Sequence, residues 1–261
     1  MNGWLERLAA RPQIGMWIAT GSAYTAEICA GSGLDWLMLD QEHVPNDLRS
    51  TLIQLQAVAA YPVEVLVRPA SGDPVTIKQL LDLGVTNLIV PMIESADAAR
   101  AVVAATRYPP EGIRGVGSAL ARASRWNRTA GYLTHAATTL SVTVQVESAA
   151  GLEALPEILA LDGIDGVFIG PADLAASLGR LGEPEHPEIV ATIERVIATI
   201  AASGKAAGVN AFNEAIARRY LAAGARFVLV GADVTLLARG SEALAACYRP
   251  DSDESEGGSS F

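Results

Sequence analysis

Ionisable and amide side chains stand where several short apolar runs of this 261-residue chain end. The runs are rich in β-branched residues and lack alternation, which is typical of parallel strands covered on both faces. Carboxyl ends of parallel strands gather at one edge of a sheet or barrel, where chemistry is usually placed. The residues concerned are Asp40, His43, Arg68, Gln145, Glu147 and Asp173.

Glu147 and Asp173 are the candidate metal ligands. Two carboxylates beside the amide of Gln145 offer hard oxygen donors, which suit Mg²⁺, Mn²⁺ or Co²⁺ with several waters retained. Either acid taken alone can instead cap the helix that follows its strand. Their joint position at two successive strand ends favours the metal site.

His43 is a candidate general acid or base, because an imidazole titrates near neutral pH. Asp40, three residues earlier, is placed to orient the ring, and Asp82 is a second candidate partner. The alternative for a single loop histidine is a solvated or capping role. His135 and His186 have no comparable context, and we interpret them as structural or surface residues.

Arg68 ends an apolar strand beside these acids. It is either a salt-bridge partner or a clamp that binds a carboxylate and stabilises developing oxyanion charge. The run Gly170–Asp173 (GPAD) predicts a helix start, where the N–H groups of Ala172 and Asp173 are available to an anionic carboxylate.

Other covalent chemistries have little support. The chain has two lysines, Lys78 on a predicted helix and Lys205 just before the seventh strand, where it faces the end opposite the chemistry. Both positions disfavour a Schiff-base aldolase, which needs an amine in the barrel mouth. The sequence also lacks a Gly-x-Ser-x-Gly nucleophile elbow.

Eight strands are predicted to carry these residues, alternating with helices that end at glycine. The predicted strands are 14–18, 36–40, 63–68, 87–91, 142–146, 166–170, 206–209 and 227–231, and the clearest helices are 47–60, 74–83, 188–203 and 213–223. Eight βα units favour a single (β/α)8 TIM barrel. No Gly-x-Gly-x-x-Gly follows the first strand, which argues against a dinucleotide fold.

Two segments stand outside this pattern. Residues 107–140 are rich in arginine and glycine, and we expect an extended βα loop over one barrel mouth. Residues 249–261 are acidic and rich in glycine and serine, so we expect a disordered tail after an enzymatic domain of residues 1–248.

Composition excludes several classes. A formal net charge of −10 argues against nucleic-acid binding and against docking on anionic membranes. No apolar run is long enough to span a bilayer, and Met1–Arg7 lacks the basic start and apolar run typical of a signal peptide, so none is expected. Cys29 and Cys247 lie far apart, which indicates a reducing cytoplasm without a disulfide framework.

The order and spacing of several segments resemble the HpcH/HpaI type of class II pyruvate aldolases, which includes 4-hydroxy-2-oxoheptanedioate aldolase and 2-dehydro-3-deoxyglucarate aldolase. The similarity runs from Gly15 to Gly240. The matching segments are Trp36–His43 (WLMLDQEH), Val67–Pro69 (VRP), Leu80–Gly84 (LLDLG), Val90–Met92 (VPM), Arg107–Gly117 (RYPPEGIRGVG), Gln145–Glu147 (QVE) and Gly163–Asp173 (GIDGVFIGPAD).

The resemblance implies a TIM barrel in a homo-hexamer, a trimer of dimers, with a C-terminal helix exchanged between subunits. It implies a divalent metal on Glu147 and Asp173, and reversible cleavage of 4-hydroxy-2-oxo acids to pyruvate, or a close 2-oxo acid such as hydroxypyruvate, and an aldehyde through a metal-stabilised enolate. The resemblance implies Arg68 on the pyruvyl oxygens, His43 in proton transfer, and Gln145, Ala172, Asp173 and Asn210 near the substrate. Asp40 and Asp82, as candidate partners of His43, and Gly170, at the predicted helix start, complete the candidate site residues.

Asn210 departs from relatives, which often carry a hydrophobic residue there near the aldehyde pocket, so the acceptor preference stays open. Two rivals stay open beside the Schiff-base aldolase. An acyl-CoA-ester lyase of the malyl-CoA or citramalyl-CoA type would share the metal site and use the arginines of 107–128 to bind a nucleotide. A non-enzymatic barrel is disfavoured because the strand-end carboxylates are present.

Overall fold

The computed structural model describes residues 2–249. The predicted acidic tail therefore lies, from residue 250 onward, outside the described residues. The catalytic-domain boundary at residue 248 stays a prediction.

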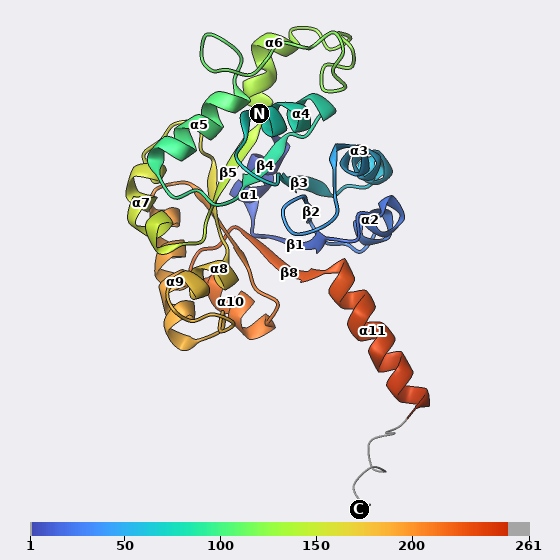
Figure 1. Cartoon of the computed structure of the whole chain (residues 1–261), viewed down its shortest axis with the longest axis vertical. Helices are drawn as coiled ribbons and strands as arrows, with labels where there is room; N and C mark the ends of the chain where they lie inside the picture. The colour runs from blue at the N-terminus through green and yellow to red at the C-terminus, as the bar shows by residue number, and fades with distance from the viewer. Residues whose placement is uncertain (1, 250–261) are drawn as a thin grey trace, which may run out of the picture.

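Eight parallel strands close into a barrel in sequence order (Figure 1). Their bounds are β1 Gln13–Ile18, β2 Trp36–Asp40, β3 Glu64–Arg68, β4 Asn87–Val90, β5 Ser141–Val146, β6 Gly166–Ile169, β7 Ala206–Asn210 and β8 Phe227–Ala232. All eight lie where the sequence predicts them, and the single (β/α)8 barrel is confirmed.

Helices connect the strands and surround the barrel. The α-helices are α1 Gly3–Ala10, α2 Ala23–Ala30, α3 Leu48–Ala57, α4 Pro74–Leu83, α5 Ala96–Thr106, α6 Tyr132–His135, α7 Ala149–Leu159, α8 Pro171–Ser177, α9 Pro187–Ala202, α10 Glu214–Ala222 and α11 Asp233–Tyr248. Two 3₁₀ turns, η1 Val58–Ala60 and η2 Ala136–Thr139, complete them. Several helices begin at a capping side chain, such as Asp73 before Pro74 of α4.

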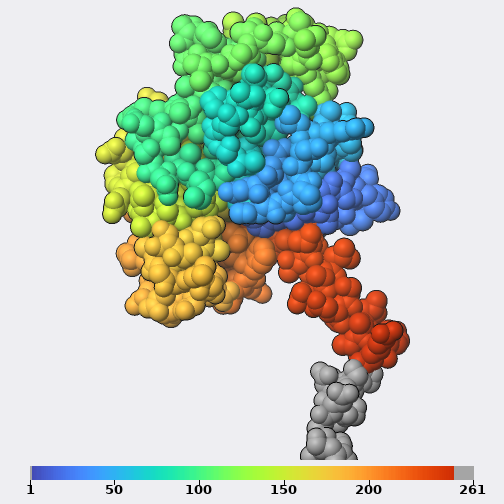
Figure 2. Space-filling view, in the orientation of Figure 1, coloured from blue at the N-terminus to red at the C-terminus, as the bar shows by residue number. Residues whose placement is uncertain are grey.

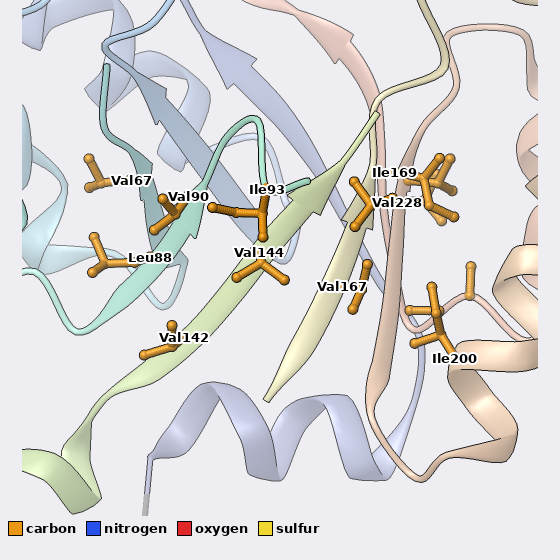
Figure 3. Close-up of a cluster of buried hydrophobic side chains, with 14 of the residues drawn as sticks. Val67, Leu88, Val90, Ile93, Val142, Val144, Val167, Ile169, Ile200 and Val228 are labelled. Atoms are coloured by element: carbon orange, nitrogen blue, oxygen red, sulfur yellow. The ribbon is translucent and has the colours of Figure 1, made fainter. Parts of the chain in front are cut away.

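Alternation along each strand divides the core into two layers. Outward residues of successive strands, such as Val67, Val90, Val144 and Ile169, pack against the helices (Figure 3). Inward residues fill the barrel itself. In β2, Trp36 and Met38 point inward, so Asp40 two residues later shares that face. The same alternation brings Arg68, Gln145 and Asn210 to the inner face at the carboxyl end.

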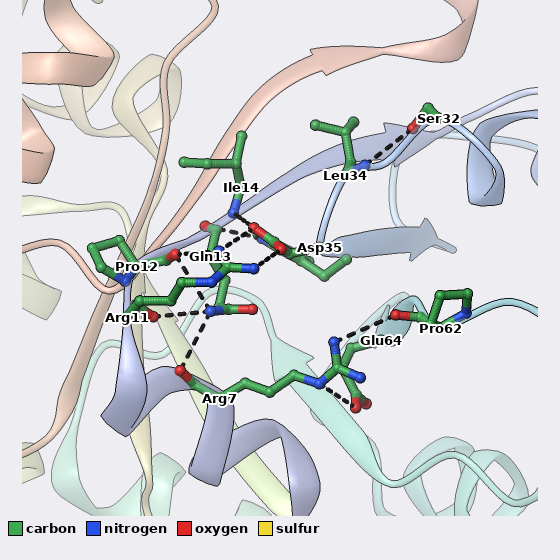
Figure 4. A network of polar contacts seen from close by, with 11 residues as sticks. Arg7, Arg11, Pro12, Gln13, Ile14, Ser32, Leu34, Asp35, Pro62 and Glu64 are labelled. Atoms are coloured by element: carbon green, nitrogen blue, oxygen red, sulfur yellow. Dashed lines mark hydrogen bonds and ion pairs between the residues drawn. The ribbon is translucent and has the colours of Figure 1, made fainter.

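The opposite end of the barrel is closed by aromatic rings and by α1. Trp4 of α1 lies 5.6 Å from Trp36 and 5.7 Å from Phe227 between ring centroids. Gly208 makes room for this cluster, because a Cβ there would overlap the Phe227 ring. Around α1, Arg11 pairs with Asp35, whose carboxylate also accepts the Ile14 N–H at 2.9 Å (Figure 4).

The expected position of the long arginine-rich segment is wrong. Helix α5 lies between β4 and this segment, so residues 107–140 form an αβ connection rather than a βα loop. Accordingly, Arg122 donates to the Leu83 carbonyl at 2.7 Å, and the Ala123 N–H donates to the Asp82 carbonyl at 3.1 Å. These contacts lie where α4 ends and β4 approaches, at the amino end of the strands. The sequence pattern misled because the Ala-rich helix before Arg107 ends without a glycine and was not recognised as an element of its own.

Helix α11 extends away from the barrel after β8 (Figures 1 and 2). Its side chains Leu236, Leu237, Leu244 and Tyr248 are more than half exposed. Exchange of this helix between subunits stays a prediction. Cys247 lies on this exposed helix and Cys29 is partly buried, and both are free thiols. Within residues 2–249 no helix combines the length and apolarity needed to cross a membrane, and the predicted cytoplasmic location stays a prediction.

Candidate active site

Strand register places Arg68 beside Asp40, since these two residues are paired across β2 and β3. The guanidinium is buried and binds the buried carboxylate through two hydrogen bonds, Nε to Oδ1 at 2.7 Å and Nη2 to Oδ2 at 2.8 Å. Such paired bonds fix the guanidinium plane as well as its position. Arg68 is therefore a preorganised cation at the carboxyl end of the barrel.

Two neighbours that the sequence did not single out complete the surroundings of Arg68. Glu42 Oε2 lies 3.0 Å from Arg68 Nη1, in an ion pair too bent to count as a hydrogen bond. The Arg68 guanidinium also lies over the Trp17 ring, 4.3 Å from its centroid. The position of Glu42 between Asp40 and His43 is a weak sequence signal for a site residue. Trp17 lies inside an apolar run and has no such signal.

His43 is exposed and lies at the same rim. The expected orientation of its ring by Asp40 is wrong within this chain: the Asp40 carboxylate accepts the backbone N–H of His43 at 3.4 Å, whereas the ring Nε2 lies 3.6 Å from Glu42 Oε2. Asp40 instead holds Arg68 and the turn that follows β2. Burial raises the pKa of Glu42, and the negative charge of Glu147 raises it further against the opposing effect of Arg68.

Asp82 is not brought to His43 within one chain. It lies in the last turn of α4, at the amino end of the barrel, and its Oδ1 accepts from Arg114 Nη2 at 2.8 Å. Arg114 is fully buried and stacks on Tyr108, 4.6 Å from its ring centroid. A role for Asp82 in proton transfer stays a prediction, because within a single subunit Asp82 is not brought to His43.

Glu147 follows β5 and is buried. Its carboxylate accepts the Met92 N–H at 3.0 Å and is bonded by Gln145 Nε2. Met92 adopts φ 56°, an unusual conformation for a residue with a side chain, and such strain gathers at functional sites. Burial raises the pKa of Glu147, the hydrogen bonds from Gln145 and Met92 oppose this, and the charge of Asp173 raises it further.

Gly170 allows the close approach of these groups. A Cβ at this position would overlap Glu147 Oε2 and lie 3.3 Å from Gln145 Nε2. After Gly170, Pro171 begins α8, and Asp173 occupies its exposed first turn. The N–H groups of Ala172 and Asp173 belong to the first helical turn and so have no intrahelical acceptor. The sequence-predicted cluster of Gly170, Ala172 and Asp173 therefore adjoins Glu147.

The donors here suit a hard divalent cation. Gln145 Oε1 is buried and, among the residues that the structure describes, has no hydrogen-bond partner. The mutual repulsion of Glu147 and Asp173 is of the kind that a cation between them relieves. Residues 2–249 contain no group of three or more His, Cys, Asp or Glu side chains arranged around a metal. Two carboxylates completed by water and substrate oxygens are the usual arrangement for Mg²⁺.

Lys205 lies as the sequence predicts, before β7 at the opposite end from Arg68. Its Nζ donates to the carbonyl oxygens of Leu161 at 2.9 Å and Ile164 at 2.7 Å. Both bonds hold the amine at the floor of the barrel, so the geometry gives no support to a Schiff-base mechanism on Lys205.

Comparison with known proteins agrees with this arrangement. Residues 13–240 match the HpcH/HpaI aldolase/citrate lyase family. The chain is 58% identical over 240 residues to the 4-hydroxy-2-oxo-heptane-1,7-dioate aldolase of Salmonella dublin, covering 92% of this chain and 91% of that protein. A solved HpcH/HpaI aldolase/citrate lyase family protein from Burkholderia cenocepacia J2315 superposes with a TM-score of 0.90 at 41% identity, over 95% of this chain and 100% of that one.

A more distant structure shares the fold. The CitE protein of Mycobacterium tuberculosis, solved in complex with magnesium and pyruvate, superposes with a TM-score of 0.59 at 18% identity over 97% of this chain and 95% of that one. The family match covers most of the present chain, and its curated relatives are aldolases. This chain thus belongs to the HpcH/HpaI aldolase/citrate lyase family, as a carbon–carbon lyase of the class II aldolase type.

Proposed function

We propose that this enzyme reversibly cleaves 4-hydroxy-2-oxo acids to pyruvate, or a close 2-oxo acid such as hydroxypyruvate, and an aldehyde. The observation that carries the proposal is Arg68: it is buried and held by Asp40, yet it keeps donors to spare. Of the five N–H groups of an arginine, two bind Asp40 and one faces Glu42, so at least two remain for a substrate.

Glu147 and Asp173 would hold the divalent cation, Mg²⁺, Mn²⁺ or Co²⁺, with Gln145 beside them. When bound, such a cation acts as a Lewis acid toward the 2-oxo group and the adjoining carboxylate. The preference among the three metals is a matter for experiment. Magnesium is the metal in the distant CitE structure.

Arg68 would bind the pyruvyl oxygens and stabilise the negative charge that develops as the C3–C4 bond breaks. A donor fixed in advance is effective here because it need not reorient during the reaction. The N–H groups of Ala172 and Asp173 would bind the carboxylate end. The product of the bond cleavage is the enolate of pyruvate, which becomes pyruvate by taking a proton at C3.

His43 would accept the proton of the C4 hydroxyl, directly or through one water. Its exposed ring is accessible to substrate at the rim, where its Nε2 lies 3.6 Å from Glu42 Oε2. In the synthetic direction the same proton returns to the aldehyde oxygen as the enolate attacks the carbonyl carbon.

The aldehyde end is expected near Asn210 and Ala172, which line a cavity of about 210 Å³ beside the ends of β6 and β7. The name of the Salmonella relatives makes 4-hydroxy-2-oxo-heptane-1,7-dioate the first substrate to test. The acyl-CoA alternative loses its sequence argument, because the arginines of residues 107–128 belong to a segment at the amino end of the barrel.

The deciding experiment strips the enzyme with EDTA, restores Mg²⁺, Mn²⁺ or Co²⁺ singly, and measures pyruvate release from a panel of 4-hydroxy-2-oxo acids. We expect no release from the stripped enzyme and recovery with at least one metal. Full activity in EDTA, together with inactivation by pyruvate and borohydride, would establish the Schiff-base rival instead.

We also propose that the chain forms a homo-hexamer, a trimer of dimers, through α11. The support is the exposed apolar side of this helix, with Leu236, Leu237 and Leu244 clear of the barrel. Sedimentation velocity of the full chain measures its mass directly. A Leu237→Glu variant is expected to sediment as a smaller species, and an unchanged hexamer in that variant would place the contact elsewhere.

A further inference from the structure

Trp17 of β1 connects two parts of the site. One face of its ring lies against the Arg68 guanidinium, 4.3 Å from centroid to Cζ, and its Nε1 donates to Asn210 Oδ1 at 3.1 Å. The three side chains come from strands β1, β3 and β7, so no local segment of the chain holds them together. Their contact is therefore a feature of the closed barrel.

The Trp17 ring restrains the one direction that hydrogen bonds leave free for Arg68. Asp40 holds the guanidinium within its own plane, through hydrogen bonds of 2.7 and 2.8 Å. An aromatic face restrains movement perpendicular to that plane, and the attraction between cation and ring adds to this restraint. The angle of the indole therefore sets where the remaining Arg68 N–H groups point.

Asn210 fixes the angle of that indole. An indole N–H is a donor only, so its hydrogen bond to one acceptor selects one orientation of the ring. Asn210 sits at the end of β7, partly exposed, and also lines the cavity of about 210 Å³ next to Ala172 and Phe212. It thus contacts the proposed aldehyde side of the site and, through Trp17, the proposed pyruvate side.

We propose that Asn210 is a positioning residue that acts through Trp17: its hydrogen bond sets the indole on which Arg68 rests and thereby tunes the binding of the 2-oxo acid. The inference rests on the proposed function, since it assigns to Arg68 the oxygens of pyruvate. It gives Asn210 a role in pyruvate binding that its position near the aldehyde cavity does not suggest.

The test is the exchange of pyruvate methyl protons with deuterated water, followed by nuclear magnetic resonance in the metal-restored enzyme. This half-reaction needs no aldehyde, so contacts of Asn210 with an acceptor do not enter it. Four proteins are compared: the unaltered enzyme, Asn210→Leu, Trp17→Phe and the double variant. Trp17→Phe keeps an aromatic face for Arg68 and removes only the N–H and part of the ring.

We expect each single variant to raise the KM for pyruvate roughly fivefold, the effect of one ordinary hydrogen bond, with kcat changed less than about twofold. The double variant should resemble the single variants rather than multiply them, because both changes remove the same interaction. A merely structural role would lower kcat with the fraction of folded enzyme and leave KM unchanged. Gln56→Leu, at an exposed amide on α3 outside the site, is the control and should keep both parameters.

Multiplying effects in the double variant, or an unchanged KM in Asn210→Leu, would overturn the inference and leave the proposed function intact. Absence of exchange in the unaltered enzyme with each of the three metals would instead overturn the proposed function. Thermal melting by circular dichroism checks folding of every variant. If Asn210→Leu does not fold, Asn210→Ala removes the same acceptor and carries the same expectations.

Discussion

The two ends of the barrel both bury charged side chains, but these side chains bond to different partners. At the amino end several of them serve the backbone, beside the Arg11–Asp35 and Arg114–Asp82 ion pairs. Lys205 donates to two carbonyl oxygens, Arg226 donates to the carbonyl of Leu8 at 2.7 Å, and Asp165 accepts the Val142 N–H at 2.8 Å. Each of these bonds satisfies a peptide group near the amino end of the barrel.

At the carboxyl end charged and amide side chains bond mainly to one another. Arg68 binds Asp40 and faces Glu42, while Gln145 binds Glu147 and keeps a buried oxygen without a partner. Unused bonding capacity occurs at both ends, since the buried Nε and Nη1 of Arg114 near the amino end also lack a hydrogen-bond partner among residues 2–249. The comparison indicates that a site differs from a scaffold when unused capacity is gathered on neighbouring carboxylate, amide and guanidinium groups, rather than by charge or burial as such.

Replacing Arg68 should produce the largest effect. Arg68→Ala is expected to lower the rate of pyruvate proton exchange and of cleavage by about 10²–10³-fold, because it removes the fixed donor for developing charge. The matched control is Arg226→Ala at the other end, where melting temperature should fall and the exchange rate per folded molecule should not. Near-normal exchange in Arg68→Ala would remove it from the enolate role.

The carboxylates come next. The double variant Glu147→Gln, Asp173→Asn should lose metal affinity by roughly a hundredfold or more, since even residues outside the ligand shell cost about 10–100-fold. Isothermal calorimetry with Mg²⁺ or Mn²⁺ measures this directly. Asp165→Asn, an acid of the amino end, serves as control and should bind metal normally. Retained affinity in the double variant would place the metal elsewhere.

His43→Ala is expected to slow cleavage about a hundredfold, the ordinary contribution of one general acid–base group. Metal affinity should be unchanged, because the ring is not among the proposed ligands. Turnover at the normal rate with metal present would assign the proton transfer to another group or to water alone.

Lys205→Met should leave catalysis unaffected and lower stability by about 1–3 kcal/mol, because two carbonyl oxygens lose their donor in partly buried surroundings. Urea unfolding and a pyruvate-release assay distinguish the two effects. Loss of turnover without loss of stability would contradict the assignment of this lysine to the scaffold.

The smallest expected effect concerns pH. Burial raises the pKa of Asp165 above its ordinary value of 3.8, so the folded state holds this proton at higher pH than the unfolded chain does. Between those two pKa values the free energy of unfolding therefore falls as pH rises. Asp165→Asn lacks this titration. The free energy of unfolding of the unaltered enzyme minus that of the variant should therefore decline from about pH 3.8 upward. Urea titrations at a series of pH values measure it, and a rising difference would contradict the sign.

The strands and the rim were predictable because they depend on local pattern. Runs such as Trp36–Asp40 are apolar on both faces, and a polar residue at the end of such a run is conspicuous. The pairing of Arg68 with Asp40 follows from parallel register once the strands are known. The position of residues 107–140 was not predictable in this way, because one unrecognised helix, α5, moves the segment to the other end of the barrel.

Contacts between distant strands also escape sequence reasoning. Trp17 lies among apolar neighbours and nothing in its own segment indicates a cation or an amide beside it. The Met92 N–H on Glu147 is a backbone group and has no sequence signature beyond the proline before it. Asp82 shows that residue type alone does not reveal the nearest partner, since within one chain its carboxylate binds Arg114 and its part in proton transfer stays a prediction.

The aromatic cluster at the amino end of the barrel has a consequence for how molecules enter and leave the site. Trp4, Trp36 and Phe227 fill the interior at the floor, with Gly208 fitted to their bulk. The barrel is therefore closed at its amino end. Reactants, products and water reach the site through the opening at its carboxyl end. A molecule bound close to that opening blocks the release of one bound deeper in the barrel, so the fold itself sets the order of binding and release.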